Sequence, residues 1–308
     1  MELRQLEYFI ACCDQGTFTA AARSLHVVQS AVSASIAKLE HELGAQVFDR
    51  TPNSLVLTDV GRAVVEPARS ALRARVEVFN AVNSLHGDIR GEVSVGALVN
   101  IVSIDLAAAF GVLHRRHPGI AIAMRQNPQG SKGNIRGIRD GTLDLALLGG
   151  VPDPIAGVQV HHLATDPLVL VCEPGHRLLA AGGFRVADLA QERTIDYPPG
   201  WGTRAVVDRF IPERRSVIEV ADQAFGIELA RQGFGVTLVP SRVAEANPEI
   251  TAVPCIDSYL EWVISIAHSA SRTPSTAASA VLDIVRQVAG AQYVDPHTGS
   301  HNGPHTET

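Results

Sequence analysis

The sequence predicts an α/β protein in three parts: a small helical module with a β-hairpin wing, a long connecting helix, and a larger domain of two open α/β lobes. Residues 1–59 show an apolar period of three to four residues, a near-heptad apolar stripe follows, and strands alternate with helices beyond residue 88. The chain has 308 residues, 46% of them hydrophobic and 19% charged, which suits a folded protein of about two domains.

Three short helices are predicted before residue 45. Glycines stand where the first and third helices should end, at Gly16 and Gly44. Only His26–Val28 separate the second helix from the third, so these two helices must cross steeply, which is the helix-turn-helix arrangement. The apolar positions that define the period are Leu3, Leu6, Ile10, Cys13, Ala21, Ala22, Leu25, Val32, Ile36, Leu39 and Leu43.

A wing and a long helix should follow. Two apolar, β-favouring runs flank the turn-rich Thr51–Ser54, which predicts a hairpin. Thr58 then caps a helix that runs from Asp59 to about Leu85. A stripe on an exposed helix needs a partner, so residues 60–87 are predicted to be a dimerisation helix. The stripe residues are Val64, Ala68, Ala71, Val78, Val82 and Leu85.

The remainder of the chain is predicted to form a domain over residues 88–290. One lobe should consist of about residues 92–162 and 267–290, and the other of about residues 163–266. Residues 291–308 are polar and irregular and should form a disordered tail, whose scattered histidines give no metal site. The expected strands are Val93–Ala97, Ile120–Met124, Leu143–Leu148, Leu168–Cys172, Ser216–Val220 and Val236–Val239, and the expected helices are about Val102–Arg116, Thr203–Phe210, Gln223–Arg231 and Thr276–Val288.

Residues 16–62 carry a set of motifs with fixed spacing. They are F-x-x-A-A-x-x-L-h at Phe18–His26, Q-S-a-x-S-x-x-I-x-x-L-E at Gln29–Glu40, E-L-G at Glu42–Gly44, F-x-R at Phe48–Arg50 and L-T-x-x-G at Leu57–Gly61. On these motifs the sequence resembles the LysR-type transcriptional regulators, and the α/β remainder fits that family's effector domain. The resemblance implies a homodimer or tetramer that binds double-stranded DNA, and a periplasmic-binding-protein-like domain that binds a small-molecule effector.

Candidate DNA-reading residues lie at the start of the third helix. With the apolar stripe of this helix buried, Gln29, Ser30 and Ser33 fall on its outward N-terminal turn. Glutamine can bond adenine through two atoms at once, and serine can serve a base or a phosphate. Arg50 and Thr51, where the chain enters the wing, are candidates for contacts to the flanking backbone or minor groove.

The resemblance adds Thr17 and Thr19 as phosphate contacts, although both residues also suit a helix cap. Residues 1–59 hold four basic against seven acidic side chains, a net charge of −3, whereas most DNA-binding modules are basic. Many relatives carry a serine at position 28 and a basic residue at position 34, where this chain has Val28 and Ala34. We therefore expect one module to bind weakly and several modules to act together.

Small ligands of open α/β folds bind beyond the carboxyl ends of strands, where helix N-termini offer free N–H groups. Effector pockets in similar regulators occupy the cleft between two lobes. Residues on the matching stretches are Asn100, Ser131, Trp201, Thr203 and Phe225. Ser131 and Thr203 also suit helix caps, and Phe225 suits a core. Few basic residues sit at these strand ends, with Lys132 and Arg204 nearest, so a small carboxylate or aromatic acid is favoured over a polyphosphate.

Enzymatic function is disfavoured because the sequence holds no GxSxG, GxxxxGK[ST] or HExxH motif. Cys172 and Cys255 lie 83 residues apart without redox spacing, so peroxide sensing by a cysteine pair, a further option in the family, is disfavoured too. No apolar stretch approaches the roughly 20 residues of a bilayer span. We expect a cytoplasmic regulator without cofactor, metal or membrane contact. The alternative is a soluble metabolite-binding protein whose N-terminal module no longer reads DNA.

Overall fold

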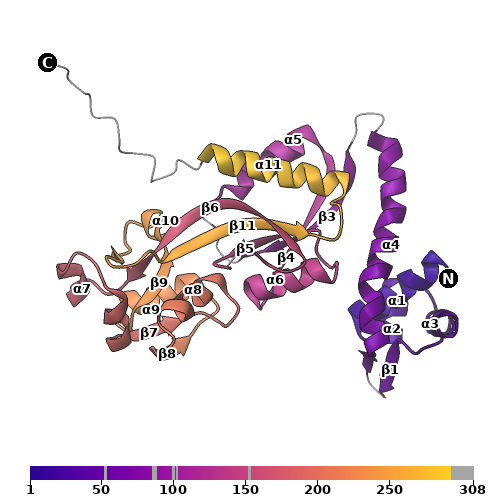
Figure 1. The fold of residues 1–308 in the computed structure, drawn as a ribbon, viewed down its shortest axis with the longest axis horizontal. Coiled ribbons are helices and arrows are strands. Elements are labelled where there is room, and N and C mark those ends of the chain that lie inside the picture. Colours follow the sequence, from indigo (N-terminus) through magenta and orange to yellow (C-terminus); the bar gives the residue numbers. More distant parts are fainter. Residues whose placement is uncertain (52–53, 85–88, 99–100, 102, 152–153, 293–308) are drawn as a thin grey trace.

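The computed structural model describes residues 1–51, 54–84, 89–98, 101, 103–151 and 154–292. The chain is mixed α/β, with a helix-turn-helix module at its N-terminus and two α/β lobes after it, as the sequence predicts. The long helix over residues 59–84 stands beside the lobes and carries the N-terminal module at its lower end (Figure 1). Within these described residues, no helix is both long and apolar enough to cross a bilayer.

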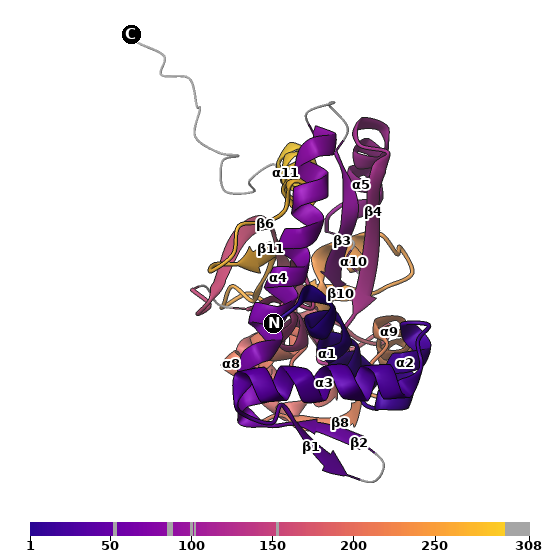
Figure 2. The same cartoon turned by 90° about the vertical axis from the view of Figure 1, so that its right-hand side faces the viewer.

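The N-terminal module contains three helices: α1 (Leu3–Gln15), α2 (Phe18–Ser24) and α3 (Gln29–Leu43). Gly16 and Gly44 end α1 and α3 in the left-handed conformation, with φ angles of 70° and 67°, which confirms both predicted stops. His26, with φ at 55°, makes the tight turn between α2 and α3. Figure 2 shows α3 lying across the module, directly above the wing.

The wing and the start of the long helix also follow the prediction. The wing is an antiparallel pair of strands, β1 (Phe48–Thr51) and β2 (Ser54–Leu57). Thr58 caps helix α4 (Asp59–Ser84), because its Oγ1 accepts a hydrogen bond from the Gly61 amide N at 2.9 Å. The wing is joined to the helical core through Phe48, whose ring centroid lies 5.4 Å from that of Phe9 and 6.3 Å from that of Phe18.

The apolar stripe of α4 divides into two halves. The core of the N-terminal module includes Val64, Ala68 and Ala71, because its three short helices alone would leave one side of that core exposed. Further along, Val76 and Val78 are 52% and 67% exposed. The expectation of one stripe facing a partner is therefore corrected: among the described stripe residues, Val64, Ala68 and Ala71 pack inside their own module and Val78 is exposed. The last two residues of the stripe, Val82 and Leu85, have side chains outside the described part of the structure.

A seven-stranded mixed sheet frames the two lobes. Its strands are β3 (Arg90–Ala97), β4 (Gly119–Gln126), β5 (Leu145–Gly149), β6 (Val158–Val171), β9 (Thr237–Pro240), β10 (Ala252–Pro254) and β11 (Glu261–Ser269). They lie in the order β10-β6-β11-β5-β3-β4, and β9 also pairs with β6. Strand β3 is parallel to β4 and β5, whereas β11 is antiparallel to β5 and β6. The parallel part is the predicted βαβ unit.

Helices cover both faces of the sheet. In the first lobe they are α5 (Leu106–Arg116), α6 (Gly130–Arg139) and α11 (Thr276–Gln292). Figure 1 shows α5 and α11 on one side of the sheet and α6 on the other. Helix α5 is shorter than expected because Asp105, which accepts from the Ala108 amide N at 2.8 Å, caps it. The second lobe adds α7 (Arg177–Ala180), η1 (Val186–Gln191), β7 (Arg193–Asp196), α8 (Gly202–Phe210), β8 (Arg215–Glu219), α9 (Gln223–Arg231) and α10 (Ser241–Glu245).

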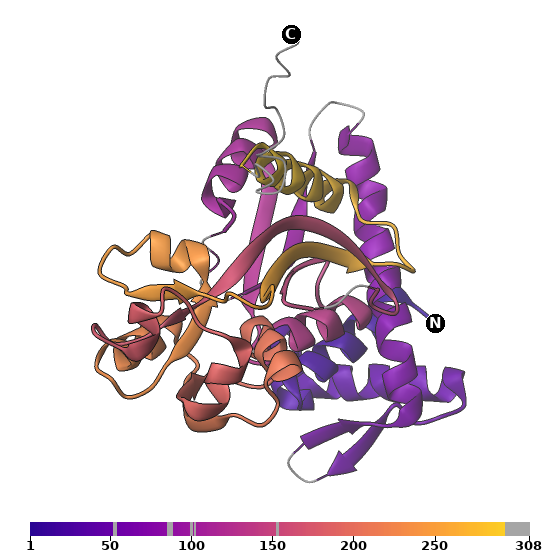
Figure 3. The ribbon, with the colours of Figure 1, turned by 60° about the vertical axis from the view of Figure 1, so that its left-hand side comes forward.

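Strand β6 belongs to both lobes. Its residues 158–167 pair with β11, and residues 168–171 pair with β9 and β10. The prediction of a short strand over Leu168–Cys172 is therefore corrected, since the strand begins at Val158. Figure 3 shows β6 and β11 curving side by side from one lobe toward the other. The chain thus passes between the lobes along two paired strands.

Two arginines fix α4 to the first lobe. Arg73 Nη1 donates from α4 to the Gly141 carbonyl oxygen at 2.8 Å. Arg272 donates through Nη1 to Glu66 Oε1 on α4 at 3.1 Å and through Nη2 to the Ile138 carbonyl oxygen. Ile138 lies in the last turn of α6, and Gly141 follows two residues after the helix ends at Arg139. Helix α6 therefore contacts α4 at one end, and its other end faces the second lobe.

Candidate functional site

The first turn of α3 presents a polar surface to solvent. Gln29 and Ser30 are exposed and Ser33 is half-buried, while Val32 is buried on the opposite side. Val28 is the N-cap residue and has no side-chain oxygen, so no side chain caps the free N–H groups of this turn. Side-chain amide, hydroxyls and backbone N–H groups are all available to a base edge or a phosphate.

The other candidate DNA contacts lie around this turn. Thr17 Oγ1 accepts from the Ala20 amide N at 3.1 Å, so Thr17 is the N-cap of α2, as the alternative interpretation held. Thr19 lies exposed in the first turn of α2 and is not a cap. Arg50 and Thr51 lie in β1, where they pair in register with β2, but their side chains are outside the described ones.

The acidic residues of the N-terminal module are largely paired. Glu2 Oε1 lies 3.0 Å from Lys38 Nζ. Glu42 pairs with the amino group of Met1, and this contact lowers the pKa of Glu42. Asp14 and Asp59 pair with two arginines of α4, Arg69 and Arg62. Counted through Ser84, the chain holds eight basic and nine acidic side chains, a net charge of −1. Helix α4 thus offsets most of the acidity of residues 1–59.

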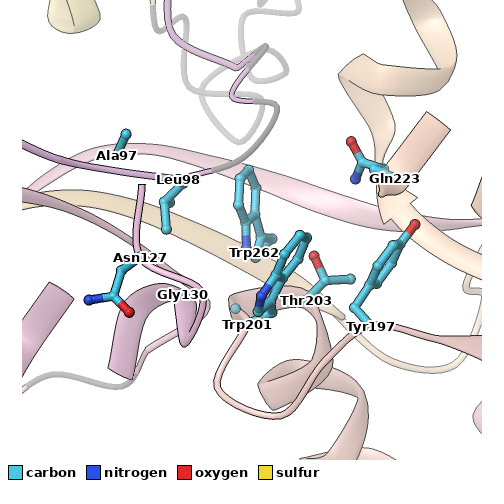
Figure 4. Close-up of a pocket in the computed structure, with 10 residues that line it drawn as sticks. Ala97, Leu98, Asn127, Gly130, Tyr197, Trp201, Thr203, Gln223 and Trp262 are labelled. Atoms are coloured by element: carbon cyan, nitrogen blue, oxygen red, sulfur yellow. The ribbon is translucent and has the colours of Figure 1, made fainter. Parts of the chain in front are cut away.

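A pocket lies between the two lobes beyond the carboxyl end of β3. Its volume is about 30 Å³, which is room for about two water molecules. Figure 4 shows side chains from both lobes meeting there, with Trp201 and Tyr197 on one side and Asn127 on the other. The lining residues are Ala97, Leu98, Asn127, Gly130, Tyr197, Trp201, Gly202, Thr203, Gln223 and Trp262.

Three helices begin at this pocket. Gly130 is the first residue of α6, Gly202 that of α8 and Gln223 that of α9. Asp222 caps α9 by accepting from the Phe225 amide N at 3.1 Å. No side chain caps α6 or α8. In α6, backbone carbonyls accept two of the first-turn N–H groups, since Gly130 N donates to the Asn127 carbonyl oxygen at 2.9 Å and Lys132 N to that of Gly200 at 3.5 Å. The positive dipole end that faces the pocket with its first-turn N–H groups is therefore that of α8.

The structure brings together two of the five residues predicted to bind an effector. Trp201 and Thr203 line the pocket. Ser131 does not: its Oγ donates to the Gly149 carbonyl oxygen at 3.1 Å and accepts from the Gly149 amide N at 3.0 Å, which ties α6 to β5. Phe225 does not line it either, because its side chain turns to solvent and is 54% exposed. Asn100 lies outside the described residues.

Sequence reasoning missed two aromatic residues of the pocket. Tyr197 stacks on Trp201 with ring centroids 5.9 Å apart and an interplanar angle of 4°. Trp262 comes from β11, a strand that was not expected. Its alternation with Ile264 and Ile266 on the buried face is a signal that could have located both the strand and the residue.

The pocket wall is uncharged. None of its lining residues, all of which are described, carries an acidic or basic side chain. Burial raises the pKa of Tyr197 to about 12, so its phenol stays neutral at physiological pH. The wall therefore combines aromatic surface with neutral hydrogen-bonding groups, a typical lining for a small organic ligand.

The lobes touch backbone to backbone beside the pocket. A Cβ at Gly150 would lie 2.3 Å from the Gly202 carbonyl oxygen, and a Cβ at Gly202 would lie 2.0 Å from the Gly149 carbonyl oxygen. Only glycine leaves room for this approach. The two lobes are therefore in direct contact at this side of the pocket.

A winged helix-turn-helix joined by a long helix to a two-lobed domain with a ligand pocket defines a ligand-responsive DNA-binding protein. The family model for the bacterial regulatory helix-turn-helix protein, lysR family, matches residues 3–62, and that for the LysR substrate binding domain matches residues 86–290. The chain belongs to the LysR family of transcriptional regulators. Because the match includes the N-terminal module, it favours a regulator over the alternative of a metabolite-binding protein that reads no DNA.

Known proteins resemble the chain over nearly its whole length. The RuBisCO operon transcriptional regulator of Allochromatium vinosum is 30% identical over 263 residues, which cover 83% of this chain and 85% of the relative. The structure of a full-length OxyR variant from Pseudomonas aeruginosa has a TM-score of 0.76 at 23% identity and covers 94% of this chain and 95% of its own. Full-length CbnR in complex with its target DNA has a TM-score of 0.61 at 23% identity, and the match covers 94% of this chain and 100% of CbnR. The two structures share the fold.

Proposed function

We propose that this LysR-family regulator reads operator DNA with the first turn of α3 and responds to a small-molecule effector in the interlobe pocket. The observation that carries the DNA-reading role is the solvent-facing, uncapped turn at Gln29 and Ser30, held rigidly by the buried side of the same helix. The protein would act in the cytoplasm, by binding rather than by catalysis.

Pairing of two copies would supply the affinity that one module lacks. The second half of α4 offers Val76 and Val78 to a partner helix. Two modules presented together bind two half-sites, and linked binding events multiply affinity without new contacts. We therefore propose a homodimer, or a tetramer built from dimers, as the DNA-binding species.

Helix α6 supports the coupling between effector and DNA. Gly130, its first residue, lines the pocket, and the carbonyl of Ile138 near its other end accepts from Arg272, which also holds Glu66 of α4. A ligand that favours one placement of the lobes would thereby favour one placement of α4. Coupling free energies of about 1–3 kcal/mol are ordinary for such linkage.

Replacing Gln29 by Ala should weaken sequence readout while leaving phosphate contacts in place. The free-energy gap between a site selected by the wild-type protein from a random DNA pool and a scrambled site should narrow by roughly 1–3 kcal/mol per altered base contact. Gel-shift titrations on both DNAs measure the gap. The slope of log K against log salt should stay negative and unchanged, because it counts phosphate contacts.

The matched control is Gln126→Ala, which removes the same side chain from an exposed position in the first lobe. It should leave both affinities as they are in the wild type. If Gln29→Ala keeps the full preference for the selected site, the first turn of α3 does not read that sequence.

Hydrogen peroxide should leave operator affinity unchanged. Burial raises the pKa of Cys12 and Cys13 to about 12 and that of Cys172 to about 11, and it also raises the pKa of Cys255. A thiol with pKa 11 is ionised in roughly one molecule in ten thousand at pH 7, and the thiolate is the form that peroxide oxidises. Intact-mass spectrometry and gel shifts after peroxide treatment check this. A thiol lost together with a change in DNA affinity would contradict it.

A further inference from the structure

Two tryptophans line the interlobe pocket, and their indole N–H groups differ. Nε1 of Trp201 donates to the Pro128 carbonyl oxygen at 3.2 Å. Trp262 is only 5% exposed, and its Nε1 has no hydrogen-bond partner among the described residues. A buried N–H without an acceptor is costly, so this donor marks the position in the pocket where an acceptor is needed.

The ring of Trp262 is held in place by one glycine from each lobe. A Cβ at Gly149 would lie 2.7 Å from Cζ2 of the indole, and a Cβ at Gly202 would lie 2.8 Å from Nε1. Figure 4 shows the nitrogen-bearing edge of Trp262 turned toward Trp201 and Thr203. The indole therefore presents its N–H at the junction of the two lobes, next to the start of α8.

Further donors surround the same point. Thr203 places its hydroxyl in the pocket, and it belongs to the first turn of α8, which has no side-chain cap. The partial positive charge of a helix N-terminus favours an anion. Since the lining residues include no arginine, lysine or histidine, the wall suits one negative charge and not a dianion or a polyphosphate.

We propose that the effector is a small organic monocarboxylate and that Trp262 Nε1 is the donor that selects it. One carboxylate oxygen accepts the indole N–H, and the start of α8 faces the negative charge. The hydrocarbon part lies against the aromatic wall of Trp201. This inference rests on the proposed function, because it assigns the chemistry of the same pocket.

The size of the pocket links this ligand to the placement of the lobes. A cavity of about 30 Å³ does not hold a molecule as large as benzoate. The backbone contact between Gly150 and Gly202 must part before such a ligand can reach Trp262. A bound monocarboxylate therefore holds the two lobes apart at Gly150 and Gly202.

Nuclear magnetic resonance tests the proposal directly, because the chain has only two tryptophans. Full-length protein labelled with [15N]tryptophan should give two indole cross-peaks, which Trp201→Phe and Trp262→Phe assign. The probes are benzoate, cyclohexanecarboxylate and butyrate, each with its neutral amide as a shape-matched control. At least one acid should move the Trp262 indole proton downfield, and move the Trp201 proton less, since that N–H already has an acceptor.

Calorimetric titration of the same acids gives the affinities. Trp262→Phe keeps an aromatic ring but loses the donor, so it should weaken binding of the active acid by about 10- to 100-fold. Trp201→Phe should weaken it less, and the matched amide should bind at least about tenfold more weakly than the acid. If Trp262→Phe does not fold, the shift of the Trp262 indole peak in the wild-type protein still tests whether the acid binds there.

Three results would overturn the inference: an acid that binds without moving the Trp262 peak, an amide that binds as tightly as its acid, or a panel in which no acid moves that peak. Gel shifts on the selected DNA site, run with the same protein, keep the two proposals apart. Salt-dependent DNA binding with no acid at Trp262 leaves the proposed function standing and removes the monocarboxylate. Loss of DNA binding by the full chain overturns the proposed function.

Discussion

Phe48→Ala should unfold the winged module and abolish operator binding. The Phe48 side chain is 1% exposed and packs between Phe9 and Phe18, where it joins the wing to the helical core. Truncating a buried phenylalanine to alanine typically costs about 3–5 kcal/mol, through lost transfer energy and the cavity left behind. A loss of this size is a large fraction of the stability of a small module.

Differential scanning calorimetry measures the effect. The transition that belongs to the N-terminal module should move to lower temperature, while that of the two lobes stays in place. Phe225→Ala is the matched control, because it makes the same change at an exposed site and should alter stability by no more than about 0.5 kcal/mol. Equal melting behaviour of the two variants would show that Phe48 does not support the module.

Arg214→Ala should destabilise the second lobe by about 3–5 kcal/mol. The Arg214 side chain is buried, and its Nε donates to Asp196 Oδ1 and Oδ2 at 2.8 and 3.0 Å. Its Nη1 also donates to the Ile211 carbonyl oxygen at 2.9 Å. Removing one partner of a buried pair leaves the other charge uncompensated, which is why the cost is large. Arg204 would offset the charge left on Asp196 only weakly, because its Nη1 lies 4.0 Å from Asp196 Oδ2.

Urea unfolding followed by far-ultraviolet circular dichroism measures this loss, with Arg215→Ala as the control. Arg215 is the next residue of the chain but lies exposed, so its removal should change stability little. Asp196 adjoins Tyr197 in the pocket wall, so Arg214→Ala should also weaken effector binding. Unchanged stability in Arg214→Ala would show that Asp196 is solvated and not held in a buried pair.

Local signals made the N-terminal module predictable. The glycine stops at Gly16 and Gly44, the cap at Thr58 and the turn-rich wing each depend on a few neighbouring residues, and the structure has all of them. The stripe of α4 was misjudged for the opposite reason. Periodicity identifies an apolar face but does not say whether its own domain or a second chain covers it.

Helix α6 escaped prediction because its sequence argues against a helix. Gly130, Gly133 and Gly137 each lower helix propensity by about 1 kcal/mol relative to alanine. The fold uses all three: Gly130 has a φ of 55°, a Cβ at Gly133 would lie 2.0 Å from Asn127 Oδ1, and a Cβ at Gly137 would lie 2.7 Å from a methyl group of Leu143. Tertiary contact overrides propensity here.

The pocket was predicted only in part because it draws on distant stretches of the chain. Trp201 and Thr203 stood out, since a loop that opens a helix is a usual place for a ligand contact. Trp262 lies on a strand near the C-terminal end of the domain. Only the order of strands in the sheet brings it beside Trp201 and Thr203, which stand more than 50 positions earlier in the sequence. Spacing along the sequence carries no information of that kind.

The paired strands β6 and β11 determine how the second lobe can travel. A two-stranded ribbon changes its twist readily, whereas sliding one strand along the other would break every hydrogen bond of the ladder and turn each side chain to the wrong face. A separation of Gly150 from Gly202 that keeps this ladder intact is accordingly a rotation of the second lobe about the two strands and not a translation along them.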